Sequence, residues 1–229
     1  MSDTIQKIGV IGAGAWGTAL AATARRCGRD VVIHAHEADV ANTINETHIN
    51  EAFLPGVDLD PEIRATTDLA EACDCDAVFL VMPAQFLRAM TTDMSGLWKS
   101  GTPAVICCKG IEQETALLMS EVCAETLADV PLAVLSGPTF AREVADGLPT
   151  GVTLACSDEV LGARLADAIG DSLFRAYRAK DMIGAELGGS VKNVLAIACG
   201  IVEGRKLGDN ARAALITRGL AETVRLALA

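Results

Sequence analysis

The stretch IGVIGAGAWG, residues 8–17, decides the fold of this chain. It joins a short β-branched apolar run to an Ala-rich segment of helical periodicity. Gly12 permits a tight turn, Gly14 lets the backbone approach a pyrophosphate, and Gly17 lets the helix pack closely on the strand. A Gly-x-Gly-x-x-Gly alone is a weak signal, and a purely structural turn is the alternative. Between a strand and a helix, however, it predicts a pyrophosphate held by the free N–H groups of the helix.

The rest of the chain repeats this alternation of apolar strand-like runs and helical stretches. Strands are predicted at residues 5–11, 31–34, 77–81, 104–107, 132–135, 152–155 and 174–177. Helices are predicted at residues 15–27, 38–48, 67–72, 84–98, 115–127 and 158–169. The pattern indicates an α/β protein with a Rossmann-like, doubly wound, mostly parallel sheet.

The character of the sequence changes after Asp181. Residues 182–202 have a helical pattern despite four glycines, each of which costs about 1 kcal/mol relative to Ala, so we expect a backbone or ligand to approach closely there. A last helix is predicted from residue 210, still running at Ala229 with no stop signal, which favours a longer natural chain. The prediction is a dinucleotide-binding domain at residues 1–181 and the first helices of an incomplete helical substrate domain at residues 182–229.

Composition narrows the range of partners. The formal net charge is −11 and no Lys/Arg cluster is present, so nucleic acid and anionic membrane surfaces are disfavoured. A small anion can still bind to a few N–H groups or one lysine. No uninterrupted apolar run reaches the roughly 18 residues that span a bilayer, and the N-terminus has no leader pattern, so we expect no membrane insertion.

The chain has eight cysteines and three histidines, without a Cys-x-x-Cys pair. This pattern disfavours a metal site and indicates that the cysteines serve as small, buried apolar side chains. Unpatterned free cysteines also indicate a protein of the reducing cytoplasm.

The end of the second predicted strand bears on cofactor choice. Glu37 has about the spacing of the carboxylate that holds the ribose 2′-OH of NAD, while His36 beside it is suited to the 2′-phosphate of NADP. A solvated loop histidine is the simpler interpretation of His36. NAD and NADP both remain open.

Two lysines stand out by position. Lys109 follows the strand at residues 104–107, at the edge of the sheet where open α/β proteins bind ligands. Lys192 lies on an otherwise apolar helix, where desolvation would favour a neutral amine suited to proton transfer. An ordinary loop lysine and a lysine whose head reaches solvent are the respective alternatives.

Six stretches together resemble the bacterial NAD(P)-dependent glycerol-3-phosphate dehydrogenases along essentially the whole chain. They are GAGAWGTALA (12–21), NEAFLPGV (50–57), CKGIEQET (108–115), LAVLSGPTFAREVADGLPT (132–150), LGGSVKNVLAIACG (187–200) and NARAALITRGLAE (210–222). Other dehydrogenases share the glycine loop but not SGPTFA or GGSVKNV.

The resemblance implies interconversion of sn-glycerol 3-phosphate and dihydroxyacetone phosphate, with reduction favoured in cells to supply phospholipid synthesis. It implies cofactor contacts from Ala15, Trp16, His36, Lys109 and Ala141. It implies substrate contacts from Lys109, Gly137 and Thr139, with Lys192 as proton donor and acceptor and Asn193 beside it.

Three departures from the family accompany this resemblance. Ala15 stands where the family commonly has Ser, an Arg is absent near His36, and the family continues for about a hundred more residues that complete the helical domain and its phosphate site. The alternatives are a non-catalytic dinucleotide-binding module and a related NADP-dependent 2-hydroxyacid or keto reductase. An apolar last helix also predicts self-association, for which a homodimer is the simplest form.

Overall fold

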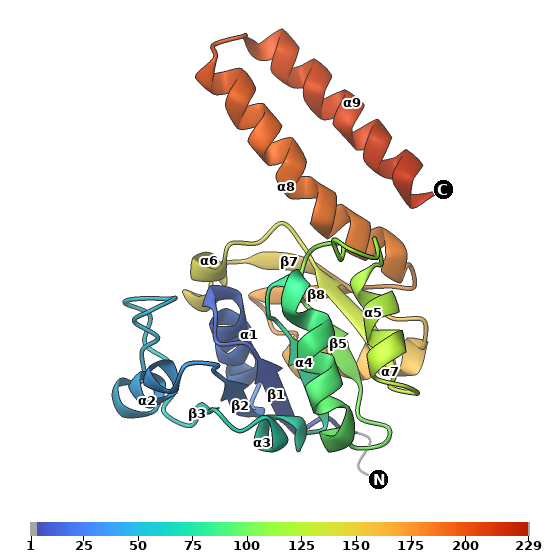
Figure 1. Cartoon of the computed structure of the whole chain (residues 1–229). Coiled ribbons are helices and arrows are strands. Elements are labelled where there is room, and N and C mark those ends of the chain that lie inside the picture. Colours follow the sequence, from blue (N-terminus) through green and yellow to red (C-terminus); the bar gives the residue numbers. More distant parts are fainter. Residues whose placement is uncertain (1–3, 229) are drawn as a thin grey trace.

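The computed structural model describes residues 4–228, which form a three-layer α/β domain and a projecting helical hairpin (Figure 1). The eight strands are β1 (Lys7–Ile11), β2 (Asp30–His34), β3 (Arg64–Thr66), β4 (Ala77–Leu80), β5 (Ala104–Ile106), β6 (Leu132–Ser136), β7 (Thr150–Ala155) and β8 (Phe174–Ala179). They form one sheet in the order β3-β2-β1-β4-β5-β6-β7-β8. All neighbours are parallel except β6 and β7. The predicted fold class is confirmed.

Helices cover both faces of this sheet. They are α1 (Ala15–Arg26), α2 (Ala38–Thr47), α3 (Leu69–Cys73), α4 (Leu87–Met94), α5 (Met119–Thr126), α6 (Ala141–Ala145) and α7 (Glu159–Ile169), with 3₁₀ turns η1 (Ala84–Phe86) and η2 (Ser95–Leu97) flanking α4. On one face, Ile8 and Val10 share a core with residues of α1 and α7. On the other, Val78 and Leu80 pack with residues of α4 and α5. Strands buried on both faces explain the nearly continuous apolar runs in the sequence.

The order of the strands positions the site. β1 pairs with β2 on one side and with β4 on the other, so the chain reverses its winding direction between them. Ligands of doubly wound sheets bind outside the carboxyl ends of the strands at such a switch point. The glycine turn lies there, and the Gly12 N–H donates to the carbonyl of His34 at the end of β2 (3.1 Å).

Several element boundaries differ from the prediction. β3 and α6 were not predicted, since three and five residues carry too little periodicity to detect. The helix predicted at residues 115–127 begins only at Met119, because Ala116 adopts a positive φ of 59° that no helix accepts.

The helical hairpin consists of α8 (Met182–Gly204) and α9 (Asp209–Ala227), which pack against each other and project from the sheet domain (Figure 1). The Asp181 carboxylate caps α8 through the Gly184 N–H (2.8 Å), and Gly208 turns the chain with φ 87°. The last helix ends at Ala227, so its predicted continuation to Ala229 is wrong at Leu228, and Ala229 lies outside the described residues.

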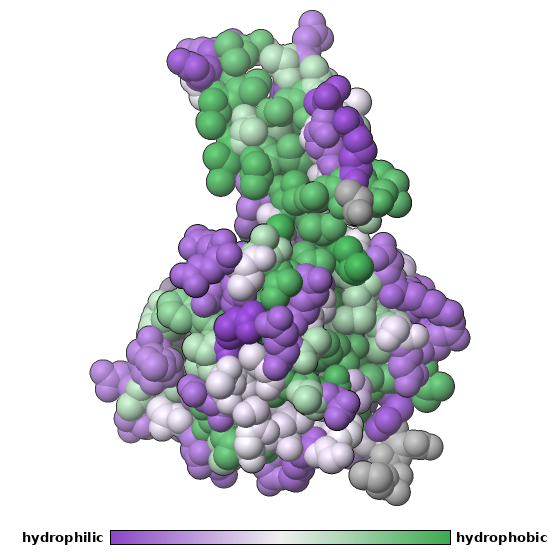
Figure 2. All heavy atoms as spheres, turned by 45° about the vertical axis from the view of Figure 1, so that its right-hand side comes forward, coloured by the Kyte–Doolittle hydropathy of each residue, from purple (hydrophilic) through white to green (hydrophobic). Residues whose placement is uncertain are grey.

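Most of this hairpin is exposed. α8 buries only Glu186, Leu187 and Gly189, and no described residue of α9 is buried. Apolar side chains therefore cover much of its surface (Figure 2). By length and composition α8 could cross a membrane, although polar residues interrupt its apolar run. That test is weak evidence, since core helices of globular proteins also pass it.

Candidate functional site

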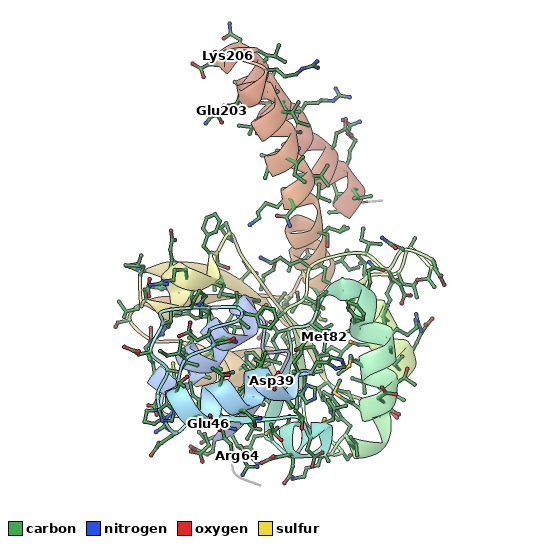
Figure 3. The ribbon with its side chains drawn as sticks, turned by 60° about the vertical axis from the view of Figure 1, so that its left-hand side comes forward. Asp39, Glu46, Arg64, Met82, Glu203 and Lys206 are labelled. Carbon is green, nitrogen blue, oxygen red and sulfur yellow. The ribbon has the colours of Figure 1, made fainter. Side chains whose placement is uncertain are left out.

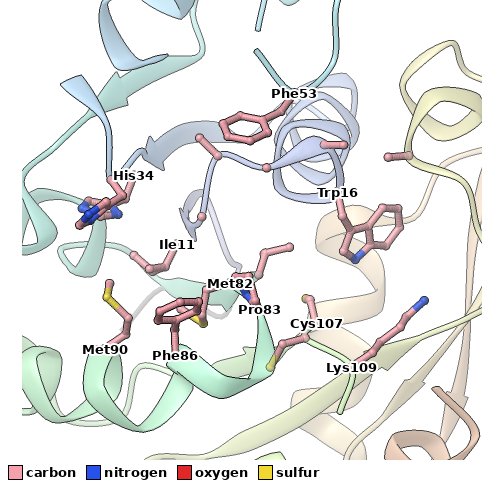
Figure 4. Close-up of a pocket in the computed structure, with 18 of the residues that line it drawn as sticks. Ile11, Trp16, His34, Phe53, Met82, Pro83, Phe86, Met90, Cys107 and Lys109 are labelled. Atoms are coloured by element: carbon pink, nitrogen blue, oxygen red, sulfur yellow. The ribbon is translucent and has the colours of Figure 1, made fainter. Parts of the chain in front are cut away.

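A pocket of about 740 Å³ opens at the switch point (Figure 4). Its wall contains most of the predicted cofactor and substrate residues, which come from four separate segments of the chain. They are Gly12, Gly14, Ala15, Trp16, His36, Lys109, Thr139 and Ala141. The glycine turn, the end of β2 and the loop after β5 thus converge on one cavity, as parallel strands with aligned carboxyl ends require.

The three glycines of the turn serve different purposes. Gly12 has φ 116°, which favours glycine. A Cβ on Gly17 would overlap the carbonyl oxygen of Gly12, so Gly17 is buried and lets α1 pack on the turn without lining the pocket. A Cβ on Gly14 would meet nothing within 4 Å, and Gly14 faces the open cavity as the N-cap of α1 without a side-chain cap. The first N–H groups of α1 are therefore available to an anion.

Trp16 supplies independent support for a bound ligand. Its indole Nε1 is buried yet has no hydrogen-bond partner among residues 4–228. A buried unpaired donor costs free energy, which a ligand acceptor would recover. The indole lies on the pocket wall near Lys109 (Figure 4). Cavity size, glycine turn and orphaned donor together fit a nicotinamide dinucleotide.

His34, His36 and Glu37 also line the pocket, and His34 lies far from Trp16 and Lys109 (Figure 4). His34 is buried, and this burial lowers its pKa. His36 and Glu37 are exposed. Apart from Lys109, no Lys or Arg is among the described residues that line the cavity. The geometry therefore presents both a carboxylate for a 2′-OH and an imidazole for a 2′-phosphate.

Lys109 is held in place at the other end. Its Nζ donates to the carbonyl of Gly137 (3.0 Å), and burial, followed by the charge of Lys192, lowers its pKa. The loop after Lys109 is tied to α4 and its preceding turn: Gln85 Nε2 donates to the Ile111 carbonyl (2.9 Å), and Arg88 forms a bidentate pair with Glu112. Lys109 is thus a partly desolvated cation on a fixed loop.

Lys192 approaches this region from α8, and Asn193 follows it in the chain. Lys192 is close enough for its charge to act on Lys109, although neither it nor Asn193 lines the pocket. Both are exposed, so of the two alternatives for Lys192 the lysine whose head reaches solvent fits this structure; past Gly189 no described residue of α8 is buried.

The glycines of α8 fulfil the expected close approach only in part. A Cβ on Gly189 would lie 2.7 Å from Ser136 Oγ and 3.5 Å from Lys109 Cγ. Gly184 accommodates the carboxylate of Asp181. A Cβ on Gly188 or Gly200 would meet no protein atom within 4 Å, so no backbone of the described residues approaches these two positions.

Sequence reasoning missed part of the wall. Phe53, Met82, Phe86 and Met90 line the cavity. Phe53 lies in the NEAFLPGV stretch, and Met82 lies two residues after the end of β4, so the positions of these two residues in the sequence point to the site. Phe86 and Met90 carry no such signal, since apolar residues one turn apart are ordinary in a helix. Among residues 4–228, no group of three or more His, Cys, Asp or Glu side chains could hold a metal ion.

Comparison with known proteins identifies the family. The sequence model described as the N-terminus of NAD-dependent glycerol-3-phosphate dehydrogenase matches residues 7–161, and that of the C-terminus matches residues 181–229. The chain belongs to the NAD-dependent glycerol-3-phosphate dehydrogenase family. It is therefore a member of a family of NAD(P)-dependent oxidoreductases, as the resemblance of its motifs predicted, and the expected NAD or NADP cofactor is confirmed at that level.

Individual proteins that are similar to this chain belong to the same family. The chain is 63% identical to the glycerol-3-phosphate dehydrogenase [NAD(P)+] of Paramagnetospirillum magneticum over 98% of its length and 82% of the relative. It is 60% identical to that of Rhodospirillum rubrum, over 99% of this chain and 65% of the relative. A crystal structure of the Coxiella burnetii dehydrogenase superposes with a TM-score of 0.92 at 40% identity, covering 98% of this chain and 69% of that one. The chain thus spans about two thirds to four fifths of these family members.

Proposed function

We propose that this chain interconverts sn-glycerol 3-phosphate and dihydroxyacetone phosphate with NAD(P), using Lys192 as proton donor and acceptor. The observation that supports this most directly is that Lys109, on the wall of the pocket, has a second lysine, Lys192, close enough for their charges to interact. Lys109 comes from the loop after β5 and Lys192 from α8, and their charges interact. Bringing two cations together is unfavourable unless an anion or a reaction uses them, and a phosphorylated substrate provides the anion.

The protein groups would act as follows. The nicotinamide, when bound, supplies or accepts the hydride. Lys192 donates a proton to the oxygen of the carbonyl undergoing reduction and removes it in the opposite direction. Lys109, fixed by the Gly137 carbonyl, stabilises negative charge on the same oxygen or on the phosphate. Thr139 on the pocket wall and Asn193 beside Lys192 orient the substrate.

The cofactor would lie along the cavity. The N–H groups of Ala15 and Trp16 at the start of α1 would hold the pyrophosphate, and a backbone contact would survive the replacement of the family's Ser by Ala15. Ala141 and Lys109 would hold the nicotinamide half, and His36 would hold the adenosine ribose or its phosphate. We propose that the site accepts both NAD and NADP, with Glu37 favouring NAD and His36 favouring NADP.

The wider setting follows from the same assignment. We propose residues 1–181 as the dinucleotide domain and residues 182–229 as the start of the substrate domain. The enzyme would work in the cytoplasm, without membrane insertion or nucleic acid, and supply glycerol 3-phosphate for phospholipid synthesis. Its exposed apolar hairpin supports self-association, as a homodimer.

The test is oxidation of NADPH and NADH that depends on dihydroxyacetone phosphate. Lys192→Ala is expected to reduce kcat by roughly 10²–10⁴, the usual contribution of general acid–base catalysis. Lys206→Ala is the matched control, since Lys206 is an exposed lysine at the far tip of the hairpin (Figure 3). Turnover that survives Lys192→Ala would contradict the assigned role.

A non-catalytic dinucleotide-binding module is the second candidate, and the exposure of Lys192 favours it. It predicts quenching of the Trp16 fluorescence by NADPH with no turnover under any substrate condition. Turnover lost in Lys192→Ala but retained in Lys206→Ala would exclude it.

A further inference from the structure

Glu186 is a buried carboxylate to which the chemistry above gives no task. It is 5% exposed, and among residues 4–228 no other Asp, Glu, Lys or Arg is buried. Burial raises its pKa. Removing a carboxylate from water costs free energy unless hydrogen bonds compensate, so the burial of Glu186 requires specific hydrogen-bond partners. It lies in the second turn of α8, six residues before Lys192.

The partners of Glu186 lie on a different element. Its carboxylate accepts hydrogen bonds from the Ser120 N–H (2.8 Å) and from the Ser120 hydroxyl (2.6 Å). Ser120 is the second residue of α5, where a backbone N–H has no partner within its own helix. A side chain of α8 therefore caps the N-terminus of α5, where the helix dipole favours a negative charge.

This cap adds to the apolar contacts that Met182, Ala185 and the buried Leu187 make where α8 meets the sheet domain. A close approach lies one turn further on, where Gly189 brings the helix backbone against Ser136 and Lys109. Residues three apart share a helix face, so Glu186 and Gly189 together define both the rotation and the axial position of α8. Past Gly189 no described residue of α8 is buried, so the position of Lys192 depends on how these first turns of α8 are held.

We propose that Glu186 is a positioning residue: by capping α5 it sets the register of α8 and holds Lys192 beside Lys109. The importance of that geometry for catalysis rests on the proposed function, but the geometry itself can be measured without turnover. The pKa of Lys109 reports on this placement, because it responds to the burial of the Lys109 amine, to the charge of Lys192 and to Cys107.

The experiment titrates the lysine amines by NMR after ¹³C-methylation; the chain has only six lysines, which makes assignment practicable. Lys192→Met removes the like charge and should shift the pKa of Lys109 upward. Glu186→Ala should shift it upward by at least as much. Glu186→Gln should retain the value of the parent chain, because its amide oxygen can accept from the Ser120 N–H while its NH₂ donates to the hydroxyl.

The double variant Glu186→Ala/Lys192→Met separates positioning from a general loss of packing. If Glu186 acts through Lys192, the double variant shifts Lys109 by less than the sum of the two single shifts. Full additivity, or a folded Glu186→Ala chain in which Lys109 titrates as in the parent, overturns the proposal. If Glu186→Ala does not fold, Ser120→Ala replaces it, with a smaller upward shift expected and an unchanged value overturning the idea. A chain without turnover would contradict the proposed function, but the NMR titration of Lys109 would still test the role of Glu186.

Discussion

The sheet domain and the α8–α9 hairpin are both regular structures of high apolar content, yet they are held together differently. The sheet domain buries its apolar side chains in two cores on either face of the sheet. The hairpin exposes Val194, Ile197, Ile201, Leu220 and Val224. Apolar residues stabilise a fold only where another surface removes them from water. The pocket that would hold the cofactor is therefore built on the well-packed part, and the proposed proton donor on the sparsely packed part.

Amide hydrogen exchange should show the largest contrast between the two parts. Central strands such as β1 and β4 are expected to open only with global unfolding, at a cost of about 5–15 kcal/mol. The amides of α9 should open at a few kcal/mol or less, since no described residue of α9 is buried. Mass spectrometry of peptic fragments measures both. Equal protection in α9 and β1 would mean that the hairpin is covered in solution.

Two glycine-to-alanine replacements are expected to change the free energy of unfolding in opposite directions. Gly17→Ala forces a Cβ into the carbonyl oxygen of Gly12, and overpacking of this kind typically costs about 1–3 kcal/mol or more. Gly188→Ala lies in the exposed part of α8 with nothing within 4 Å, so it should stabilise the helix by up to about 1 kcal/mol. Urea unfolding followed by circular dichroism checks both. A Gly17→Ala chain as stable as its parent would show that α1 can move away from the turn.

Gly14→Ala tests the pocket without disturbing the fold. A Cβ at residue 14 meets no atom of the protein within 4 Å, so stability should change little. It would, however, occupy the space that a pyrophosphate needs, and the Kd for NADPH should rise by tenfold or more, equivalent to about 1.4 kcal/mol. Fluorescence titration through Trp16 gives the Kd, with Gly96→Ala, also free of neighbours, as the control.

Much of the sheet domain could be predicted from the sequence, and what could not be predicted has physical causes. IGVIGAGAWG predicts the turn because strand, glycines and helix all agree locally. The alternation of strands predicts the sheet for the same reason. The sequence could not show that Lys192 is exposed or that Gly188 faces open space, because hydrophobicity reports what a helix can bury and not whether a partner is present. Nor could it single out Glu186, since its bond to Ser120 spans 66 residues and leaves no local pattern.

The smallest predicted effect concerns the joint between the two parts. Burial raises the pKa of Glu186, so the folded chain holds this proton more tightly than the unfolded chain does. The free energy of unfolding should therefore fall as the pH rises from the ordinary range of glutamate, about 4.3, through the raised value. Glu186→Gln has no such proton, so relative to the parent it should become progressively more stable across that interval and then level off. Urea unfolding of both chains between pH 4 and pH 8 isolates the difference, because every other titrating group is common to the two. A difference that stays constant over that range would mean that the cap on α5 compensates the carboxylate fully for its loss of water.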